Sequence, residues 1–422
     1  MKYVKPMKQI RTYTLACLAL LLASCNNDGG DFSDGTHTGN RNAVSVTFSL
    51  SSAVKSATGE LMNNVVYPTA TEGILVGEQH TKTVYLYIFQ GQGEEGTCVA
   101  CENVGWEDYF GDGLPVHTDE SEMTYEIAYE GFQYGVPYTL MAVGLSEGAE
   151  TVYGFPDGIT TGQEGTPGTK LGEAAAILQQ GQTTEGIRSS EVYVGWTDFV
   201  LGSATTPTIE LFRRVAAVAG YFKNIPRQLK HPDTQALTNV TTLRLALYTQ
   251  QNTRLPLVER AQSPVFRDFI DSPAEPGSEV LASMDLTGGN YFTAAEDGDI
   301  ASGACYLLPI PSPDNNPDVT GESKDYTLCI ELVAEDGTVL RRQRAMLPEG
   351  DELDPGITGG GTGIIDSESA YRYPIVANHF YAFGDEDHPI DLKGNGADLT
   401  ITVDPAWKGE ENLGITEGTT EN

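Results

Sequence analysis

The strongest constraint on the fold is a strict alternation of apolar and polar residues at positions 44–50. Four apolar side chains, Val44, Val46, Phe48 and Leu50, are separated by single serine or threonine residues. Side chains of a β-strand point alternately to opposite faces, so a period of two indicates a strand with one buried face. We therefore predict a first strand with these four side chains on its buried face.

Similar patterns recur along the chain. Residues 83–90 are apolar on both faces, which is typical of a central strand. Residues 123–129 alternate, and we expect them to pair with residues 138–145, which follow a short turn. In the second half residues 326–332 alternate, and Asp336-Gly337 predicts a hairpin turn directly after them. Strands therefore dominate both halves of the sequence.

Chain length and loop composition predict how these strands are organised. A chain of 422 residues exceeds the usual size of one domain, and no short repeat suggests a solenoid or propeller. The segment 202–208 has the composition of a linker, and residues 171–181 form one modest helical patch. We predict an all-β fold of two Greek-key β-sandwich domains in tandem, residues 43–203 and 204–410, followed by a polar tail at 411–422.

The first 25 residues have the features of a targeting segment. A basic stretch contains Lys2, Lys5, Lys8 and Arg11. The apolar run from Thr14 to Ala23 has the length of a secretory h-region and is too short to span a bilayer. Leu22 to Cys25 resembles the lipobox of bacterial lipoproteins, in which the cysteine is acylated and becomes the new N-terminus. We expect a signal peptide at 1–24. An ordinary signal peptide cut nearby would instead leave Cys25 a free thiol.

The residues after Cys25 are acidic and polar. Asn26, Asn27, Asp28 and Asp31 resemble the surface-export signal of Bacteroidales lipoproteins. Acyl chains hold a protein on a membrane without a transmembrane helix. We therefore expect an acidic flexible tether at 25–42 and a lipid-anchored protein exposed on the cell outer membrane.

The charge balance excludes one class of partner. The chain has 25 basic and 59 acidic side chains, and residues 1–24 carry four of the basic ones and no acidic one. Removal of that segment leaves 21 basic against 59 acidic side chains, a net charge of −38. Nucleic acid is not expected as a partner, because binding it requires a basic surface. We interpret the large negative net charge as favouring solubility.

Four cysteines remain besides Cys17 and Cys25. Cys98 and Cys101 form a single C-x-x-C, which cannot supply four zinc ligands and lacks the helix of a thioredoxin-like site. A local disulfide or two idle thiols is expected there. Cys305 and Cys329 lie in two expected strands and could form a disulfide in an oxidising compartment.

Catalytic motifs are weak. Residues Gly144 to Gly148 match the G-x-S-x-G pattern around Ser146, but a nucleophile elbow needs a helix directly after the serine, and the segment that follows is turn-rich. His379 lies in a strand pattern and is read as a packing residue. We expect no enzymatic activity and no catalytic residue.

Metal and phosphate motifs are also missing from the sequence. The histidines are scattered and none has the spacing of a zinc site. Acidic stretches at 297–300, 313–318 and 384–391 lack the spacing of an EF-hand, and Gly359 to Gly363 lacks the lysine of a phosphate loop. We expect no metal and no cofactor.

Arg213 and Arg214 are adjacent charges within an apolar segment. In a strand one of the two points inward unless a bulge intervenes, and a buried arginine needs a carboxylate or carbonyl partner. The favoured interpretation is a structural role. A processing site or a contact between domains is the alternative.

Four segments resemble the fimbrillin superfamily of type V pili, in particular its fimbrial subunits and anchor lipoproteins. They are SSEVYVGWTDF, IELFRRVAAVAGYFKNIP, YPIVANHFYAFG and ADLTITVDPAW, in that order along the chain. The resemblance implies two transthyretin-like β-sandwiches and outer-membrane attachment through lipid. It also implies assembly with other fimbrial subunits by β-strand complementation, in which one subunit's strand completes another's sheet.

The resemblance makes it possible to ask whether this chain is a stalk subunit or an anchor subunit. In stalk members an arginine-specific protease removes the lipid segment together with the first strand. Here the candidate processing site Arg41 lies before that strand, and the next arginine is Arg188. The tail after Trp407 offers only Leu413 and Ile415 as apolar anchors, which makes a poor donor strand. Both departures favour a subunit that keeps its lipid and its first strand, and they equally fit a lipoprotein that does not polymerise.

A second function is compatible with the same fold. A surface lipoprotein built from β-sandwiches could bind a glycan or another host or bacterial surface ligand. Sugar sites usually present exposed aromatic rings, and of the three tryptophans only Trp106 is expected to be exposed, with Tyr109 and Phe110 beside it. Trp196 and Trp407 are expected in the core.

Overall fold

The structure is a computed structural model of the chain, and it is described here for part of the sequence. The described residues are 44–50, 66–68, 73–75, 81–91, 93–110, 122–202, 206–248, 252–258, 279–292, 298–310, 326–349, 370–394 and 398–404. The described residues belong to one compact unit, residues 42–422. Cys25 and Arg41 lie outside the described residues, as do the predicted signal peptide, tether and polar tail.

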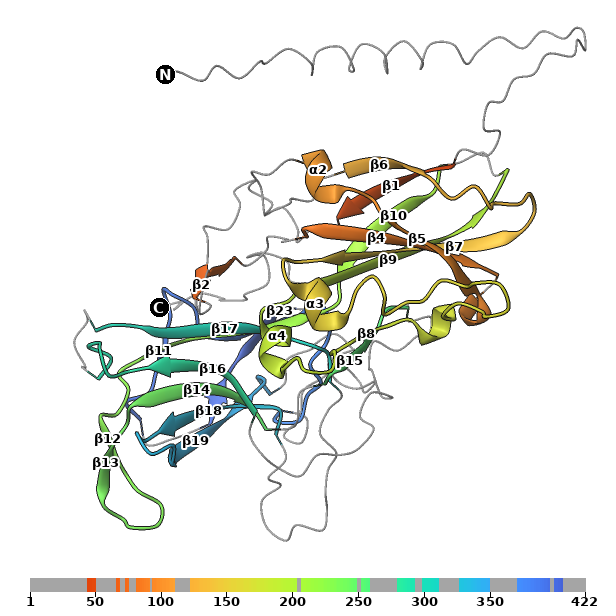
Figure 1. Cartoon of the computed structure of the whole chain (residues 1–422). Helices are drawn as coiled ribbons and strands as arrows, with labels where there is room; N and C mark the ends of the chain where they lie inside the picture. Colours follow the sequence, from red (N-terminus) through yellow and green to blue (C-terminus); the bar gives the residue numbers. More distant parts are fainter. Residues whose placement is uncertain are drawn as a thin grey trace, which may run out of the picture. The chain divides into compact units, whose positions relative to one another are not determined.

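One seven-stranded sheet forms the first half of the compact unit (Figure 1). Its strand order is β5 (Thr97–Asn103), β4 (Thr83–Gln90), β7 (Pro137–Leu145), β9 (Val192–Val200), β10 (Thr208–Arg213), β1 (Val44–Leu50) and β6 (Glu122–Ile127). Side chains from strands at both ends of this order share one core, including Val46, Leu86, Met123 and Ile209. Strands far apart in one sheet can share a core only if the sheet curls, so this sheet closes around its own apolar face.

Two further sheets form the second half as a β-sandwich. One has the order β17 (Ala301–Leu307), β11 (Ala216–Lys223), β20 (Phe380–Phe383) and β23 (Thr402–Asp404), and β21 (Ile390–Asp391) also pairs with β11. The other has the order β16 (Glu279–Asp285), β14 (Thr242–Leu247), β18 (Leu328–Val333), β19 (Val339–Met346) and β22 (Leu399–Thr400). A single core that includes Val218, Phe222, Leu245, Ile330 and Phe383 draws residues from both sheets, as in other sandwiches.

The remaining elements are short. In the described part of the chain the helices are α2 (Trp106–Phe110), α3 (Ala149–Tyr153) and α4 (Thr184–Arg188), with 3-10 turns η1 (Gly93–Glu95) and η2 (Leu171–Glu173). The two-stranded pairs are β2 (Val66–Pro68) with β3 (Gly73–Leu75), β12 (Gln228–Lys230) with β13 (Leu237–Asn239), and β8 (Ala175–Ile177) with β15 (Arg254–Pro256). Among the residues described, no helix has both the length and the apolar character needed to cross a bilayer.

A third core joins the two halves within the compact unit. It combines residues of β7 and β9, such as Met141 and Val194, with residues of β11 and β17, such as Ala217 and Tyr306. The β8–β15 pair contributes backbone hydrogen bonds between the same halves, and Arg188 forms an ion pair with Glu279 at 3.0 Å. The halves therefore share a continuous apolar interface.

The all-β prediction is confirmed, and so is the Asp336-Gly337 hairpin. β18 and β19 pair around that turn, where Gly337 has a φ of 87° and the Asp336 carboxylate accepts a hydrogen bond from the N–H of Thr338 at 2.9 Å. A φ of this sign favours glycine. The turn chemistry therefore determines this connection.

Two local predictions are wrong. Residues 123–129 and 138–145 do not pair, because β6 pairs with β1 whereas β7 pairs with β4 and β9. The patch 171–181 is not an α-helix: it contains η2 and then β8, whose alanines pair with β15. Burial of small side chains at the interface between the halves outweighs the helix propensity of alanine.

The passage between the halves lies later than the predicted boundary at 203/204. β10, Thr208–Arg213, belongs to the first sheet, where it pairs with β1 and β9. The chain enters the second half only at β11, which begins at Ala216. The linker-like composition of 202–208 marks the connection between β9 and β10.

Candidate functional site: the first-strand groove

The candidate site is the position of β1 in the first sheet, between β10 and β6. We call the space that β1 occupies between these neighbours the first-strand groove. β1 runs parallel to β10, with Phe48 opposite Ile209, and antiparallel to β6, with Phe48 opposite Met123. β1 is thus paired on both sides by strands that lie much later in the sequence.

The three inward side chains of β1 that the structure describes are buried. Val46 and Phe48 have no exposed surface and Val44 is 6% exposed, whereas the side chain of Leu50 lies outside the described residues. Burial of each such side chain stabilises the folded state by roughly 1.5–3 kcal/mol. These inward-facing side chains therefore contribute substantially to the stability of the surrounding core.

The outer face of β1 is polar. Ser45, Thr47 and Ser49 are half-buried, and the hydroxyl of Thr47 lies 3.2 Å from that of Thr124 on β6. The backbone N–H of Thr47 donates to the carbonyl of Pro207 at 3.0 Å. Alternation and register agree, because a shift by one residue would turn these polar side chains into the core.

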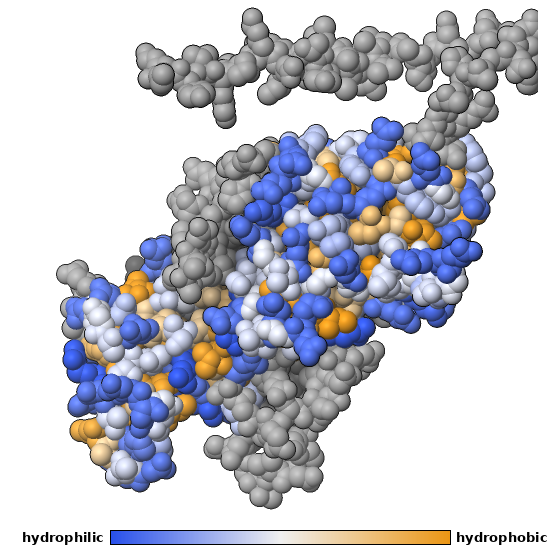
Figure 2. All heavy atoms as spheres, viewed as in Figure 1, coloured by the Kyte–Doolittle hydropathy of each residue, from blue (hydrophilic) through white to orange (hydrophobic). Residues whose placement is uncertain are grey.

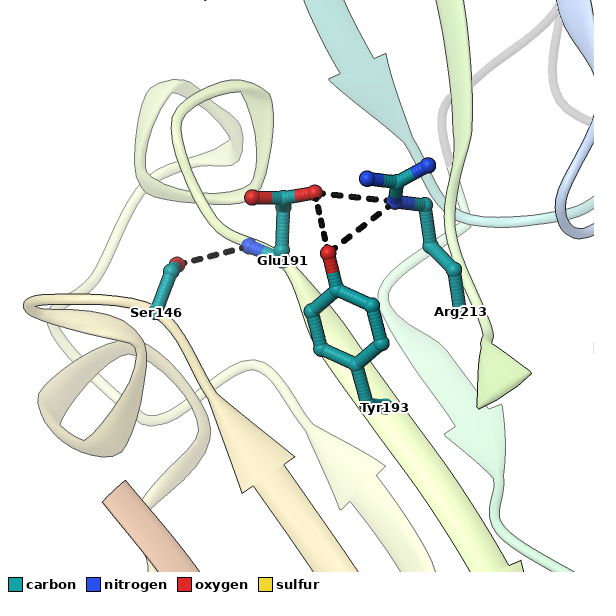
Figure 3. A network of polar contacts seen from close by, with 4 residues as sticks. All are labelled: Ser146, Glu191, Tyr193 and Arg213. Atoms are coloured by element: carbon teal, nitrogen blue, oxygen red, sulfur yellow. Dashed lines mark hydrogen bonds and ion pairs between the residues drawn. The ribbon is translucent and has the colours of Figure 1, made fainter. Parts of the chain in front are cut away.

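A buried polar network lies at the far end of β10 (Figure 3). Nε of Arg213 donates to Oε1 of Glu191 at 2.8 Å and to the hydroxyl of Tyr193 at 3.2 Å. The Tyr193 hydroxyl donates to the same Glu191 oxygen at 2.7 Å. The prediction that an inward arginine needs a carboxylate partner is confirmed.

Arg213 stays charged although it is buried, because its partners offset the effect of burial. The side chains of Arg213 and Glu191 are 3% and 1% exposed. Burial by itself lowers the pKa of Arg213, but Tyr193 and Glu191 raise it above its ordinary value. Burial raises the pKa of Tyr193 well above its usual range, so the phenol stays protonated. A dry ion pair of this kind is costly to break from one side.

Ser146 belongs to this network as a structural residue. Its hydroxyl oxygen accepts a hydrogen bond from the backbone N–H of Glu191 at 2.8 Å, and it is 7% exposed. The segment after this serine is turn-rich as predicted, but between its turns it contains the short helix α3, which begins at Ala149 and was not predicted. The geometry nevertheless gives Ser146 a role in joining the ends of β7 and β9.

The four cysteines of the described residues are free thiols, so neither possible disulfide is formed and the alternative of unpaired thiols holds at Cys98 and Cys101. Cys98 and Cys101 lie three residues apart in β5, and an extended strand separates such Cα atoms by roughly 10 Å, beyond the reach of a disulfide. Cys305 lies in the core between the two sheets of the sandwich, whereas Cys329 packs in a separate cluster with Ala246 and Tyr326.

Burial also makes these thiols poor nucleophiles. It raises the pKa of Cys98, Cys305 and Cys329 to about 12 each and that of Cys101 to about 11. The thiolate is the reactive form. The geometry thus provides no redox centre at the C-x-x-C.

The predicted aromatic platform is absent at Trp106. This residue is 1% exposed and belongs to the core of the first sheet, so the expectation of an exposed ring is wrong. The first residue of α2 carries the indole into the apolar interior, where it packs against Phe110 with ring centroids 4.7 Å apart. Tyr109 is 57% exposed. On the face in Figure 2 apolar residues appear as small separate patches among polar ones.

His379 is 8% exposed, and its Nδ1 lies 2.8 Å from the carbonyl oxygen of Ala377, which fits the predicted packing role. Within the described ranges no group of three or more His, Cys, Asp or Glu side chains is placed to hold a metal ion.

Sequence reasoning missed the partner of Arg213 and both neighbours of β1. Glu191 was not identified as the partner of Arg213, although a lone acidic residue directly before the apolar run Val192–Val194 was a usable signal. β10 and β6 were not identified as neighbours of β1, because strand pairing over such distances leaves no local signal.

Comparisons with known proteins give structural likeness alone. No protein-family profile matches the chain, and no curated protein matches it. Three similar solved structures are a candidate polysaccharide-binding protein of Bacteroides thetaiotaomicron and two proteins of Porphyromonas gingivalis, the tip fimbrial protein Mfa3 and the fimbrial anchor protein Mfa2. Their sequences are 13%, 11% and 13% identical to this chain, with TM-scores of 0.35, 0.36 and 0.29.

The alignments are long even though the scores are low. They cover 82%, 86% and 81% of this chain and 93%, 98% and 89% of the respective structures. Such scores do not establish a common fold. The proposals below therefore rest on the sequence and on the contacts of this chain.

Proposed function

We propose that this chain is a surface lipoprotein that serves as a structural subunit of a type V-like fimbria, as its membrane anchor or an accessory subunit. The single observation that carries the proposal is the position of β1, buried on its inner face and paired on both sides. A strand that fills a groove between two others is the arrangement on which β-strand complementation depends.

The order of the processing signals supports retention of β1. Cys25 follows the lipobox-like Leu22–Ser24, and Arg41 lies three residues before Val44. A cut after Arg41 would remove a lipid on Cys25 but would leave β1 in its groove. An anchor needs the lipid and the filled groove together, so such a chain would remain uncut at Arg41.

The first test is the mass of the protein isolated from its native surface. We expect an acylated Cys25 at the N-terminus and the Val44–Leu50 segment present. Cys25→Ser should move the protein out of the outer-membrane fraction, whereas Cys101→Ser, a matched change at a half-buried thiol, should leave it there. A mature N-terminus beyond Leu50, or membrane retention of Cys25→Ser, would contradict the proposal.

The second test addresses assembly. A chain that lacks residues 44–50 should expose the first-strand groove and capture a synthetic peptide with the sequence of residues 42–51. The same peptide with Val46 and Phe48 replaced by Asp is the control, because it cannot fill the apolar positions. Equal binding of both peptides would argue against complementation.

A further inference from the structure

Glu102 connects the two end strands of the first sheet. It lies in β5, at one end of the strand order, and its carboxylate binds β6 and the residues directly after it, at the other end. Oε2 accepts a hydrogen bond from the N–H of Ala128 at 2.9 Å and from the hydroxyl of Tyr125 at 2.9 Å. Oε1 accepts one from the N–H of Tyr129 at 2.7 Å.

These contacts matter because of what β6 holds. Within the described residues β6 forms a backbone ladder with β1 alone. Tyr125, which binds Glu102 with its side chain, is the residue paired with the buried Val46 of β1. β6 is thus held by β1 on one side and by the Glu102 carboxylate on the other. Hydrogen bonds to an ionised carboxylate are stronger than those between neutral groups.

We propose that Glu102 is a clasp that closes the sheet over β1 and prevents another subunit's strand from replacing it. The inference rests on the proposed function and adds how its groove is regulated. To leave the sheet, β1 must break its ladders with β10 and with β6. While Glu102 holds Tyr125, Ala128 and Tyr129, β6 cannot move away to begin that process.

The aromatic contacts made by the segment after β6 do not depend on the Glu102 carboxylate. Tyr129 contacts Phe132 edge-on with ring centroids 5.0 Å apart, and Phe132 contacts Phe199 in the same way at 5.5 Å. The N–H of Gln133 also donates to the hydroxyl of Tyr138 at 3.0 Å. These contacts do not involve Glu102. Loss of the carboxylate should therefore free β6 locally while the rest of the first half stays folded.

The phenol contributes over a wide pH range. Burial and the hydrogen bond to Glu102 together raise the pKa of Tyr125 to about 12, so its hydroxyl remains a donor to the carboxylate under ordinary conditions.

The experiment measures exchange of β1 in the intact purified chain. A biotinylated peptide of residues 42–51 is added in excess, and its stable incorporation is followed with time in the wild-type protein and in Glu102→Gln, Tyr125→Phe and Glu126→Gln. The amide of Gln keeps one acceptor oxygen and places an NH2 group at the other position. In either orientation this NH2 group meets a backbone N–H, that of Ala128 or that of Tyr129, so the clasp loses at least one hydrogen bond at constant size. Glu126 is exposed on β6 and serves as the matched control.

We expect incorporation to be at least roughly tenfold faster in Glu102→Gln, the effect of losing about one strong hydrogen bond, and to rise less in Tyr125→Phe. Glu126→Gln should match the wild type. Equal incorporation in all four proteins would overturn the clasp and leave strand complementation standing. No incorporation in any of them, nor in a chain that lacks β1, would overturn both.

If Glu102→Gln fails to fold, Tyr125→Phe decides the question, together with backbone hydrogen exchange of the wild type. The amides of Ala128 and Tyr129 should then be protected as strongly as those of β1. Fast exchange at both amides would overturn the clasp.

Discussion

The two halves of the compact unit close their cores in different ways. The first half curls one sheet around a core completed by β1, a strand paired with partners roughly 75 to 160 residues later in the chain. The second half packs two sheets face to face, and its adjacent β18 and β19 are joined by a tight hairpin. A strand held by a hairpin cannot leave without its neighbour, whereas β1 has no hairpin to either partner. The first half is therefore the one suited to strand exchange.

The largest effect that separates the halves is expected from their buried phenylalanines. Phe48 in β1 and Phe222 in β11 both have no exposed surface, so replacement of either by Ala should lower the free energy of unfolding by about 3–5 kcal/mol. Urea denaturation measures the loss. When the peptide 42–51 is present during refolding from urea, it should restore stability to Phe48→Ala alone, because it can then take the place of the damaged β1 before Glu102 binds β6. Rescue of both variants, or of neither, would remove the proposed difference.

The two halves also differ in how deeply their ion pairs are buried. Arg213 and Glu191 are both buried, whereas Arg342 is 35% exposed beside the buried Glu331. Arg213→Met leaves a carboxylate without its charged partner in a dry site and should cost about 3–5 kcal/mol. Arg342→Met should cost clearly less, since water can reach its position. Thermal unfolding compares the two variants, and equal losses would contradict the argument from exposure.

The sequence predicted what depends on local pattern. The alternation at Val44–Phe48 indicated a strand and its buried face, and the Asp336-Gly337 turn indicated the hairpin, because both follow from neighbouring residues. The inward arginine at 213 followed from the cost of a buried charge. In each case the physical requirement is fully contained within a few adjacent positions.

What the sequence could not predict depends on distant partners. Glu102 looks like an ordinary polar residue of an edge strand, and only the curl of the sheet brings it to Tyr125. Trp106 was expected to be exposed, with Tyr109 and Phe110 beside it, yet the short helix α2 turns its indole into the core. The 171–181 patch had helix formers, but pairing of β8 with β15 decided its structure. Tertiary packing outweighed local preference in all three.

Thiol chemistry offers a probe of each half separately. Cys98 lies in the first half and Cys305 in the second, and burial raises the pKa of each to about 12. At pH 8 only roughly one in ten thousand such thiols is ionised, so iodoacetamide should leave both unmodified in the native protein. With rising urea, mass spectrometry should find Cys98 modified first in Phe48→Ala and Cys305 first in Phe222→Ala. The same order in both variants would indicate that the halves unfold as one unit.

The smallest effect is expected at a partly exposed pair of the second half. Asp398 accepts hydrogen bonds from Arg344 at 2.7 Å and from Tyr371 at 2.9 Å. Burial alone raises the pKa of Asp398, but these two partners lower it below the ordinary 3.8. A carboxyl whose folded pKa is depressed adds stability above its unfolded pKa and loses it as pH falls through the folded value.

Asp398→Asn should therefore lower the free energy of unfolding by about 1 kcal/mol or less at pH 7, the usual range for a partly exposed pair. The difference from the wild type should shrink as the pH falls below 3.8, because the wild-type carboxyl becomes neutral too. Urea denaturation across this pH range measures it. Glu126→Asn, an exposed change in the first half, should show no such convergence. A difference that stays constant down to low pH would mean that Asp398 acts through its shape and hydrogen bonds rather than through its charge.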